Sequence, residues 1–160
     1  MAKSVERVRE YFRTHNLPIQ VQELPGSTRT AQLAAEAVGS ELGQIVKSLV
    51  FIDAEDHTIL AFVAGDRRAD PAKIAQVVQS SSVRIANAEE VRTRTGFAIG
   101  GVAPVAHTVD NIAVRLMDRS LSRYERVWAA AGAPNAVFPI ELRTLLDLTG
   151  ARVEEIAVAD

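Results

Sequence analysis

The sequence predicts a mixed α/β fold, in which a largely antiparallel sheet or a partly open barrel is flanked by helices. Two short apolar segments, 45–52 and 58–64, lie on either side of a polar turn at 54–57, which is the pattern of a hairpin of buried strands. Helical patterns occur before and after this hairpin, but strands and helices do not alternate strictly as in a parallel α/β fold. We therefore expect antiparallel pairs in a mixed sheet.

Each element is predicted from the spacing of apolar residues and from the residues at its ends. Val5, Val8 and the aromatic residues that follow recur at helical spacing. Thr28 or Thr30 is expected to cap the second helix, and Gly39 to end it. The expected helices are 3–15, a segment ending at 38, 71–79, 88–95 and 140–148, and the expected strands are 19–24, 45–52, 58–64, 83–86, 111–117, 126–131 and 151–158.

Length and composition are those of an ordinary globular protein, and we assign residues 1–160 to one domain. There is no run of about 18 apolar residues that would span a membrane, and the N-terminal residues lack the apolar segment of a signal peptide. We therefore expect a cytoplasmic protein with no membrane partner. Because the formal net charge is −2, any polyanion would have to be bound by a local patch rather than by the whole surface.

The residue types present also narrow the chemistry. Cysteine is absent, which excludes disulfides, a thiol nucleophile and a cysteine-based metal site. The three histidines show no metal-binding spacing, so we expect no metal and no cofactor. Ser48 cannot readily pair with Lys47, because neighbours on a strand face opposite sides. An enzyme with this sequence would have to rely on positioning and on stabilising an oxyanion.

Lys47 lies in the middle of the apolar strand 45–52 and is the most informative residue of the chain. Alternation along a strand puts it on the same face as Ile45, Leu49 and Phe51. An ammonium group is costly to bury in apolar surroundings unless an anion or hydrogen-bond acceptors compensate. Two interpretations remain open: a cation at the mouth of a pocket, or an edge-strand lysine that reaches water and discourages aggregation.

The second informative feature is the segment Gly96-Phe97-Ala98-Ile99-Gly100-Gly101-Val102-Ala103-Pro104. Its glycines allow positive φ angles and a close approach of a ligand to the backbone. Such a loop can present several N–H donors to a carbonyl or phosphate oxygen. It has neither the ending of a phosphate-binding P-loop nor the dinucleotide spacing, so a tight structural turn is the alternative interpretation.

Four segments that follow one another in the chain resemble the YbaK/ProX/EbsC family, the free-standing aminoacyl-tRNA deacylases related to the editing insertion domain of bacterial prolyl-tRNA synthetase. They contain the strand lysine, the charged turn after the second hairpin strand, the glycine loop and a Gly-Ala-Pro-Asn segment, at residues 46–51, 62–68, 100–104 and 132–139. The resemblance extends from about Thr28 to Ala151 and implies an editing domain of this type, which needs no cofactor.

The resemblance implies that the protein hydrolyses the ester bond of mischarged tRNA in trans. Lys47 matches the family lysine that contacts the terminal adenosine or the aminoacyl end, and Gly100 and Gly101 belong to the loop around the scissile carbonyl. The family is thought to use a hydroxyl of the substrate's terminal ribose rather than a protein nucleophile. The further residues expected to bind substrate are Thr28, Arg29, Ile45, Leu49, Ile99, Val102, Ala103, Pro104, His107 and Asn135.

One departure from the family pattern affects the expected substrate. Alanine-specific relatives have a histidine in a glycine-containing segment near the C-terminal end, where this chain has Gly132-Ala133-Pro134-Asn135. This difference argues against alanine as the amino acid removed from tRNA. Serine, threonine, cysteine and 2-aminobutyrate remain candidates for that amino acid. The low net charge indicates modest affinity for tRNA alone, so a synthetase partner is expected to assist. The alternative function is a non-catalytic module that binds tRNA ends, nucleotides or a protein.

Overall fold

The computed structural model describes residues 2–25, 30–109 and 111–159 of the chain. The helices are α1 (Ala2–Thr14), α2 (Ala31–Val38), η1 (Leu42–Gln44), α3 (Pro71–Val78), α4 (Ala88–Thr95), η2 (Arg119–Arg123) and α5 (Leu142–Thr149). The strands are β1 (Gln22–Glu23), β2 (Ile45–Asp53), β3 (Thr58–Ala64), β4 (Val83–Ile85), β5 (Ile112–Asp118), β6 (Arg126–Ala130), β7 (Ala136–Glu141) and β8 (Arg152–Glu154). None of the helices in the described ranges is long and apolar enough to cross a membrane.

The strands form one open mixed sheet in the order β1-β7-β6-β2-β3-β5-β8, and β4 also pairs with β2. Four of the strand pairs are antiparallel and three are parallel. The expected hairpin forms the centre of the sheet, with β2 and β3 in register from Val46 opposite Ala64 to Ile52 opposite Thr58. The prediction of a mixed α/β fold with a largely antiparallel sheet is confirmed.

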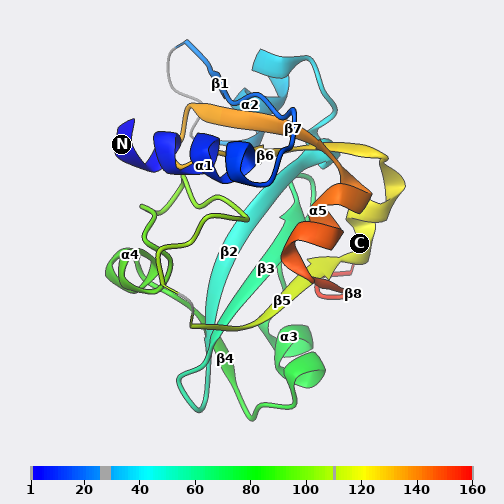
Figure 1. The fold of residues 1–160 in the computed structure, drawn as a ribbon. Coiled ribbons are helices and arrows are strands. Elements are labelled where there is room, and N and C mark those ends of the chain that lie inside the picture. The colour runs from blue at the N-terminus through cyan, green and yellow to red at the C-terminus, as the bar shows by residue number, and fades with distance from the viewer. Residues whose placement is uncertain (1, 26–29, 110, 160) are drawn as a thin grey trace.

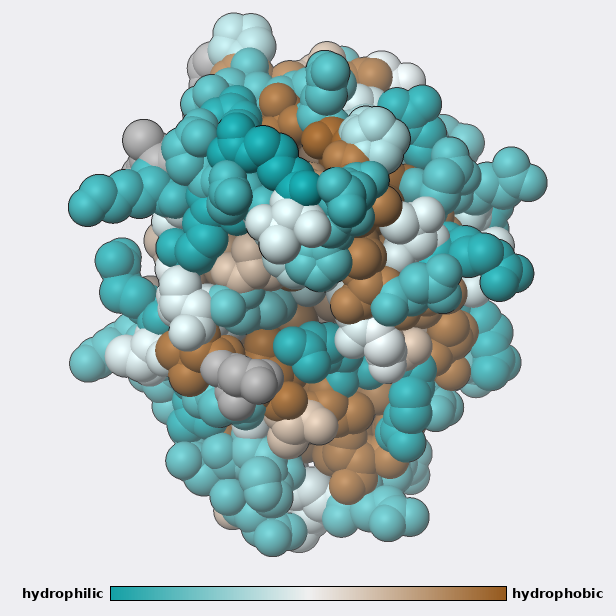
Figure 2. Space-filling view, in the orientation of Figure 1, coloured by the Kyte–Doolittle hydropathy of each residue, from teal (hydrophilic) through white to brown (hydrophobic). Residues whose placement is uncertain are grey.

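Helices cover both faces of this sheet (Figure 1). On one face α1, α4 and α5 pack with the even-numbered side chains of β2, such as Val46 and Val50, in the main core. On the other face Ile74 of α3 packs with Phe51 in a second cluster. The side of the molecule in Figure 2 is mostly hydrophilic, with apolar areas gathered across its middle. The sheet is thus enclosed, as the continuous apolar character of β3 predicts.

The predicted helix boundaries rest on capping groups that the structure contains. Thr30 accepts a hydrogen bond from the N–H of Leu33, and Gly39 ends α2 with a φ angle of 71°. Thr28, the other cap candidate, lies outside the described residues. Asp70 caps the N–H of Ala72 in α3, and α4 begins with a reciprocal cap between Asn87 and Glu90.

The prediction is wrong in the region of β7. Residues 140 and 141 were expected to begin the last helix, but they end a strand, and α5 begins at Leu142. Pro139 obscures this strand in the sequence, because proline removes a ladder donor. In the structure Ala131 donates to Ala136, so the pair of Trp128 and Pro139 exchanges no bonds in the β6–β7 ladder. The missing N–H therefore removes no bond of that ladder.

The strands near the chain ends are shorter than predicted. The segment 19–24 joins the sheet only at Gln22 and Glu23, and 151–158 joins it only over Arg152–Glu154, with a separate antiparallel bridge between Ala157 and Ala69. Both strands lie at the two ends of the sheet. The alternation of side chains in the sequence indicates extended backbone, but it does not indicate how long a neighbouring strand runs beside it.

Candidate functional site

The central strand β2 has a break in its pairing along one edge. Its other edge is paired with β3 over nearly its whole length. On the broken edge, β6 pairs only with Ile45 and Val46, and β4 pairs only from Phe51 to Asp53. Residues 47–50 of β2 therefore face a gap in the sheet without a strand partner.

The register determines which backbone groups point into this gap. The N–H of Gly65 donates to Ile45, and the N–H of Asp53 donates to His57, so the odd-numbered residues of β2 are those bonded to the hairpin partner. The N–H and C=O groups of Ser48 and Val50 consequently point toward the open edge. The carbonyl of Val50 accepts from Ala86, so Ser48 is the residue whose N–H and C=O groups both face the gap.

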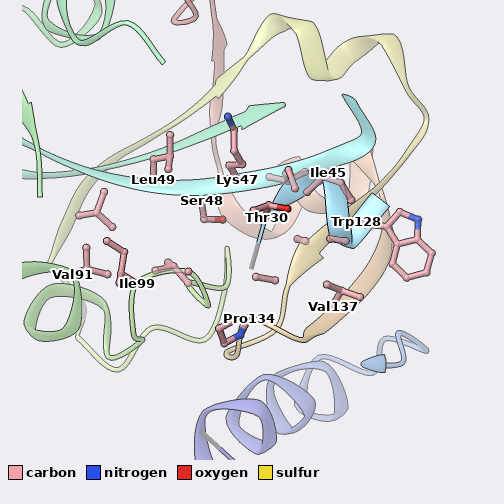
Figure 3. Close-up of a pocket in the computed structure, with 18 of the residues that line it drawn as sticks. Thr30, Ile45, Lys47, Ser48, Leu49, Val91, Ile99, Trp128, Pro134 and Val137 are labelled. Carbon is pink, nitrogen blue, oxygen red and sulfur yellow. The ribbon is translucent and has the colours of Figure 1, made fainter. Parts of the chain in front are cut away.

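A cavity of about 310 Å³ occupies this break. Its walls are mainly small or aliphatic side chains, and Thr30, Lys47 and Ser48 are polar exceptions (Figure 3). No Asp, Glu or His side chain is part of its lining within the described ranges. The lining residues are Thr30, Ala31, Ala34, Ile45, Val46, Lys47, Ser48, Leu49, Val50, Ile85, Ala86, Val91, Ile99, Gly100, Val102, Trp128, Ala129, Ala130, Pro134 and Val137.

Lys47 and Ser48 are both among the lining residues, but their side chains lie on opposite faces of β2 (Figure 3). Ser48 is on the face toward Val91, Ile99 and Pro134, and the Lys47 side chain points away from these residues. The ammonium of Lys47 donates a hydrogen bond to the carbonyl oxygen of Arg67. Burial lowers the pKa of Lys47, and the nearby carboxylate of Asp66 raises it in part. Lys47, Ile99 and Gly100 are thus all among the lining residues, but the ammonium lies on the other side of the strand from Ser48, and the expected role of Lys47 at the pocket stays a prediction.

The carboxylate near Lys47 is held in place by two arginines. Arg123 donates to both oxygens of Asp66, at 2.8 and 2.9 Å, and Arg67 lies 3.1 Å from the same carboxylate. The hydrogen bonds from Arg123 are the main cause of the lowered pKa of Asp66. Lys47 thus stands beside a fixed negative charge at the border of the cavity.

Ser48 has the most distinctive environment in the site. Its Oγ atom is buried, and it is the single buried side-chain nitrogen or oxygen without a hydrogen-bond partner in the part of the chain that the structure describes. A buried polar group is almost always hydrogen-bonded, because leaving it unsatisfied costs about 1–3 kcal/mol. The hydroxyl of Thr30, in contrast, already accepts from Leu33.

The glycine loop contributes to the cavity with only part of its length. Ile99, Gly100 and Val102 are among the lining residues, and Gly100 has a φ angle of 87° that favours glycine. The N–H of Gly101 donates to Ala98. A Cβ atom on Gly101 would lie 2.9 Å from the Cα of Ala133, so this glycine packs against the Ala133 backbone.

Ala103, Pro104 and His107 lie behind the cavity wall. The Nε2 of His107 donates to the carbonyl of Ala103 at 2.8 Å, and burial lowers the pKa of His107 to about 4. Arg7 of α1 donates to the carbonyls of Ala106 and Gly96. These contacts hold the loop against the core, and none of these residues belongs to the cavity lining.

The remaining predicted residues are placed as follows. Ile45 and Leu49 line the cavity with Lys47. Asn135 donates to the carbonyl of Leu24 at 3.3 Å, and its own carbonyl accepts from the N–H of Leu24, so it fastens the segment after β1 rather than lining the cavity. Thr28 and Arg29 lie outside the described residues, and their expected roles stay predictions.

The sequence did not reveal several residues of the cavity, namely Ser48 in a binding role and the wall residues Ile85, Trp128, Pro134 and Val137. Their positions depend on how β4, β6 and β7 arrange around β2, which no local pattern indicates. No group of three or more His, Asp or Glu side chains in the described segments is arranged to hold a metal ion.

Comparisons with known proteins agree with this picture. Residues 26–148 match the aminoacyl-tRNA editing domain family. The uncharacterized protein YwhH of Bacillus subtilis is 33% identical over 94% of this chain and 94% of its own length. EbsC of Enterococcus faecalis, a proposed Cys-tRNA(Pro)/Cys-tRNA(Cys) deacylase, is 22% identical over 91% of this chain and 89% of its own. The crystal structure of a proposed trans-editing enzyme for prolyl-tRNA synthetase is 44% identical, with a TM-score of 0.90 over 98% of both chains.

Proposed function

This chain belongs to the aminoacyl-tRNA editing domain family, and from that premise we propose that it hydrolyses the ester between a small amino acid and the terminal ribose of a mischarged tRNA. The candidate amino acids are serine, threonine, cysteine, alanine and 2-aminobutyrate. The related structure described as a trans-editing enzyme supports action in trans, as a protein separate from the synthetase that made the error.

The observation that carries the proposal is the cavity at the break in β2. Its volume of about 310 Å³ is at the lower end of the roughly 300–1,000 Å³ typical of small-molecule sites. Such a cavity admits a small aminoacyl group and excludes bulky ones, which is how editing sites spare correctly charged tRNA. Its aliphatic walls suit a short side chain, and the unpaired strand edge offers hydrogen bonds to the polar main-chain atoms of an amino acid.

The mechanism proposed here uses no protein nucleophile. No acidic or imidazole side chain lines the described cavity to activate Ser48, so water is the attacking group and the neighbouring ribose hydroxyl of the substrate orients it. Water adds to the ester carbonyl, the bond from the carbonyl carbon to the ribose oxygen breaks, and that oxygen takes up a proton. Backbone N–H groups at the cavity stabilise the developing oxyanion.

Lys47 is proposed to bind the acceptor end of the tRNA at the border of the cavity. An ammonium has three donors, and the carbonyl of Arg67 occupies one of them. The others are available to a phosphate or to the terminal adenosine. A synthetase partner would supply further binding contacts to the tRNA, because the net charge of −2 gives the protein little general attraction to a polyanion.

Lys47→Met tests this role, because methionine keeps an apolar stem and removes the charge. We expect the deacylation rate on mischarged tRNA to fall by about 100-fold or more, as when an electrostatic donor is removed from an active site, while circular dichroism shows an intact fold. A variant that retains the full rate would overturn the role of Lys47. If the wild-type protein binds tRNA ends without any hydrolysis, the non-catalytic binding module replaces the deacylase.

A further inference from the structure

The unpartnered hydroxyl of Ser48 is not explained by the fold. Removing a buried hydroxyl that has no hydrogen bond does not weaken a protein, and alanine would pack in the same position. The side chain belongs to the cavity lining and points to the side of β2 opposite Lys47 (Figure 3). A polar group kept unsatisfied in an otherwise apolar wall is available for a ligand.

The geometry of the strand edge indicates which part of a ligand meets this hydroxyl. The N–H and C=O of Ser48 point into the gap in the plane of the sheet, where a carbonyl oxygen and an amino group can pair with them as a short added strand would. An aminoacyl group carries both partners, its ester carbonyl and its α-amino group. Bound in this way, it would occupy the position opposite Ser48.

Side chains at opposite positions of paired strands lie on the same face of the sheet, with Cβ atoms about 4.5–5.5 Å apart. The side chain of the bound aminoacyl group would therefore lie beside the Ser48 Oγ. That separation suits a hydrogen bond between two short hydroxyl side chains. The even-numbered neighbours of Ser48 on this face, Val46 and Val50, belong to the apolar core and offer no competing partner.

We propose that Ser48 is the specificity-determining residue of the site, and that its hydroxyl recognises the side-chain hydroxyl of a seryl or threonyl ester. This inference rests on the proposed deacylase function and narrows its substrate class. A pocket that hydrogen-bonds a substrate hydroxyl discriminates strongly against an analogue that lacks it, because the polar group of the site is then left unpaired.

Seryl-tRNA and 2-aminobutyryl-tRNA form a matched pair of substrates, because the two side chains have the same size and differ by a hydroxyl in place of a methyl group. We expect the wild-type protein to prefer the seryl ester. Ser48→Ala should lower kcat/KM for the seryl ester by about 10- to 100-fold and change that for the 2-aminobutyryl ester by less than about threefold. Ser48→Thr, which keeps a hydroxyl, should retain the preference for serine.

A uniform loss across both esters would overturn the assignment, since Ser48 would then contact the α-amino group or the ribose, which all substrates share. A Ser48→Ala protein with a lowered melting temperature would also contradict it, because the hydroxyl would then be structural.

Binding of non-hydrolysable analogues separates this inference from the function on which it rests. Adenosine carrying a 3′-amide-linked seryl or 2-aminobutyryl group can be titrated calorimetrically against wild-type and Ser48→Ala protein. Tighter binding of the seryl analogue, lost in the variant, supports the role of Ser48 even if ester turnover fails. Hydrolysis of both esters with equal analogue affinities overturns the Ser48 assignment alone, and absence of both turnover and binding overturns the proposed function with it.

Discussion

Lys47 and Ser48 are consecutive in β2, yet their side chains have different environments. Lys47 is tied to the carbonyl of Arg67 beside the fixed carboxylate of Asp66, whereas Ser48 has its backbone at the open edge and its hydroxyl unpaired. In the proposed function the two residues have different roles: Lys47 binds the charged acceptor end of the tRNA, and Ser48 binds the aminoacyl group. The alternation of a strand provides this division without any irregularity in the backbone.

His107 gives a prediction about stability and pH. Burial is the main cause that lowers its pKa to about 4; the hydrogen bond to Ala103 opposes this shift, and the charges of Arg115 and Arg7 add to it. The pKa of a histidine in the unfolded chain is about 6.5. As the pH falls from about 6.5 to about 4, the unfolded chain binds a proton that the folded protein does not. The free energy of unfolding should therefore decrease over this window by about 2–3 kcal/mol through this residue.

The variant His107→Gln isolates this contribution, because glutamine can still donate to Ala103 and does not titrate. Urea denaturation at about pH 7 and about pH 4.5 should show a smaller loss of stability in the variant than in the wild-type protein. The same loss in both proteins would show that His107 does not take part in the pH dependence.

At the scale of the residue, the sequence indicated that the charge of Lys47 is constrained, but it did not indicate where the side chain points relative to the cavity. A lysine inside an apolar run signals a constrained charge, and in the structure the ammonium is bound to the carbonyl of Arg67 on the face of β2 opposite Ser48. The role of Ser48 was not predictable, because a serine in a strand is ordinary and only its missing partner distinguishes it. Whether the Ser48 hydroxyl has a partner depends on how the surrounding strands and loops are arranged, and the sequence does not reveal that arrangement.

At the scale of the element, the loop after α4 forms part of the cavity wall, and we expect it to limit the side chains admitted. Ile99 lines it while 56% of its surface remains exposed, so trimming this side chain should change stability by less than about 0.5 kcal/mol. The variant Ile99→Ala should admit larger side chains and raise the deacylation rate of valyl-tRNA by about 10-fold, since a methylene in such a pocket is worth about 1–3 kcal/mol.

Leu33→Ala is the matched control for this prediction. Leu33 is also exposed, at 43%, but it does not line the cavity, so its replacement should leave the rates for seryl- and valyl-tRNA unchanged. An unchanged substrate range in the Ile99→Ala protein would mean that the loop does not control admission to the site.

Element prediction succeeded where local signals decide the structure. The hairpin of β2 and β3 and the start of α3 follow from an apolar run and from a proline beside a capping aspartate. It failed for β7, whose Pro139 argues against a strand unless the pairing is known. The break in β2 could not be predicted for a related reason, since it exists only because β6 ends early and β4 begins late beside the same strand.

At the scale of the whole molecule, residues 2–25, 30–109 and 111–159 form an enclosed mixed sheet whose strand pairing is interrupted along β2. Helices pack on both faces of the sheet (Figure 1), and the cavity lies where strand pairing stops rather than on the outer surface of a helix. A site in the pairing gap offers backbone hydrogen bonds in fixed positions, which suits a reaction that depends on placing an ester and a water. The family membership of residues 26–148 agrees with that architecture.

The most direct test of the account is the initial rate of deacylation by the wild-type protein on tRNAs that carry serine, threonine, cysteine, alanine or 2-aminobutyrate, each compared with spontaneous hydrolysis. The account predicts accelerated release of at least one of these small amino acids, with the seryl or threonyl ester hydrolysed fastest. Rates equal to the spontaneous ones for every ester, with folded protein and intact tRNA, would contradict it.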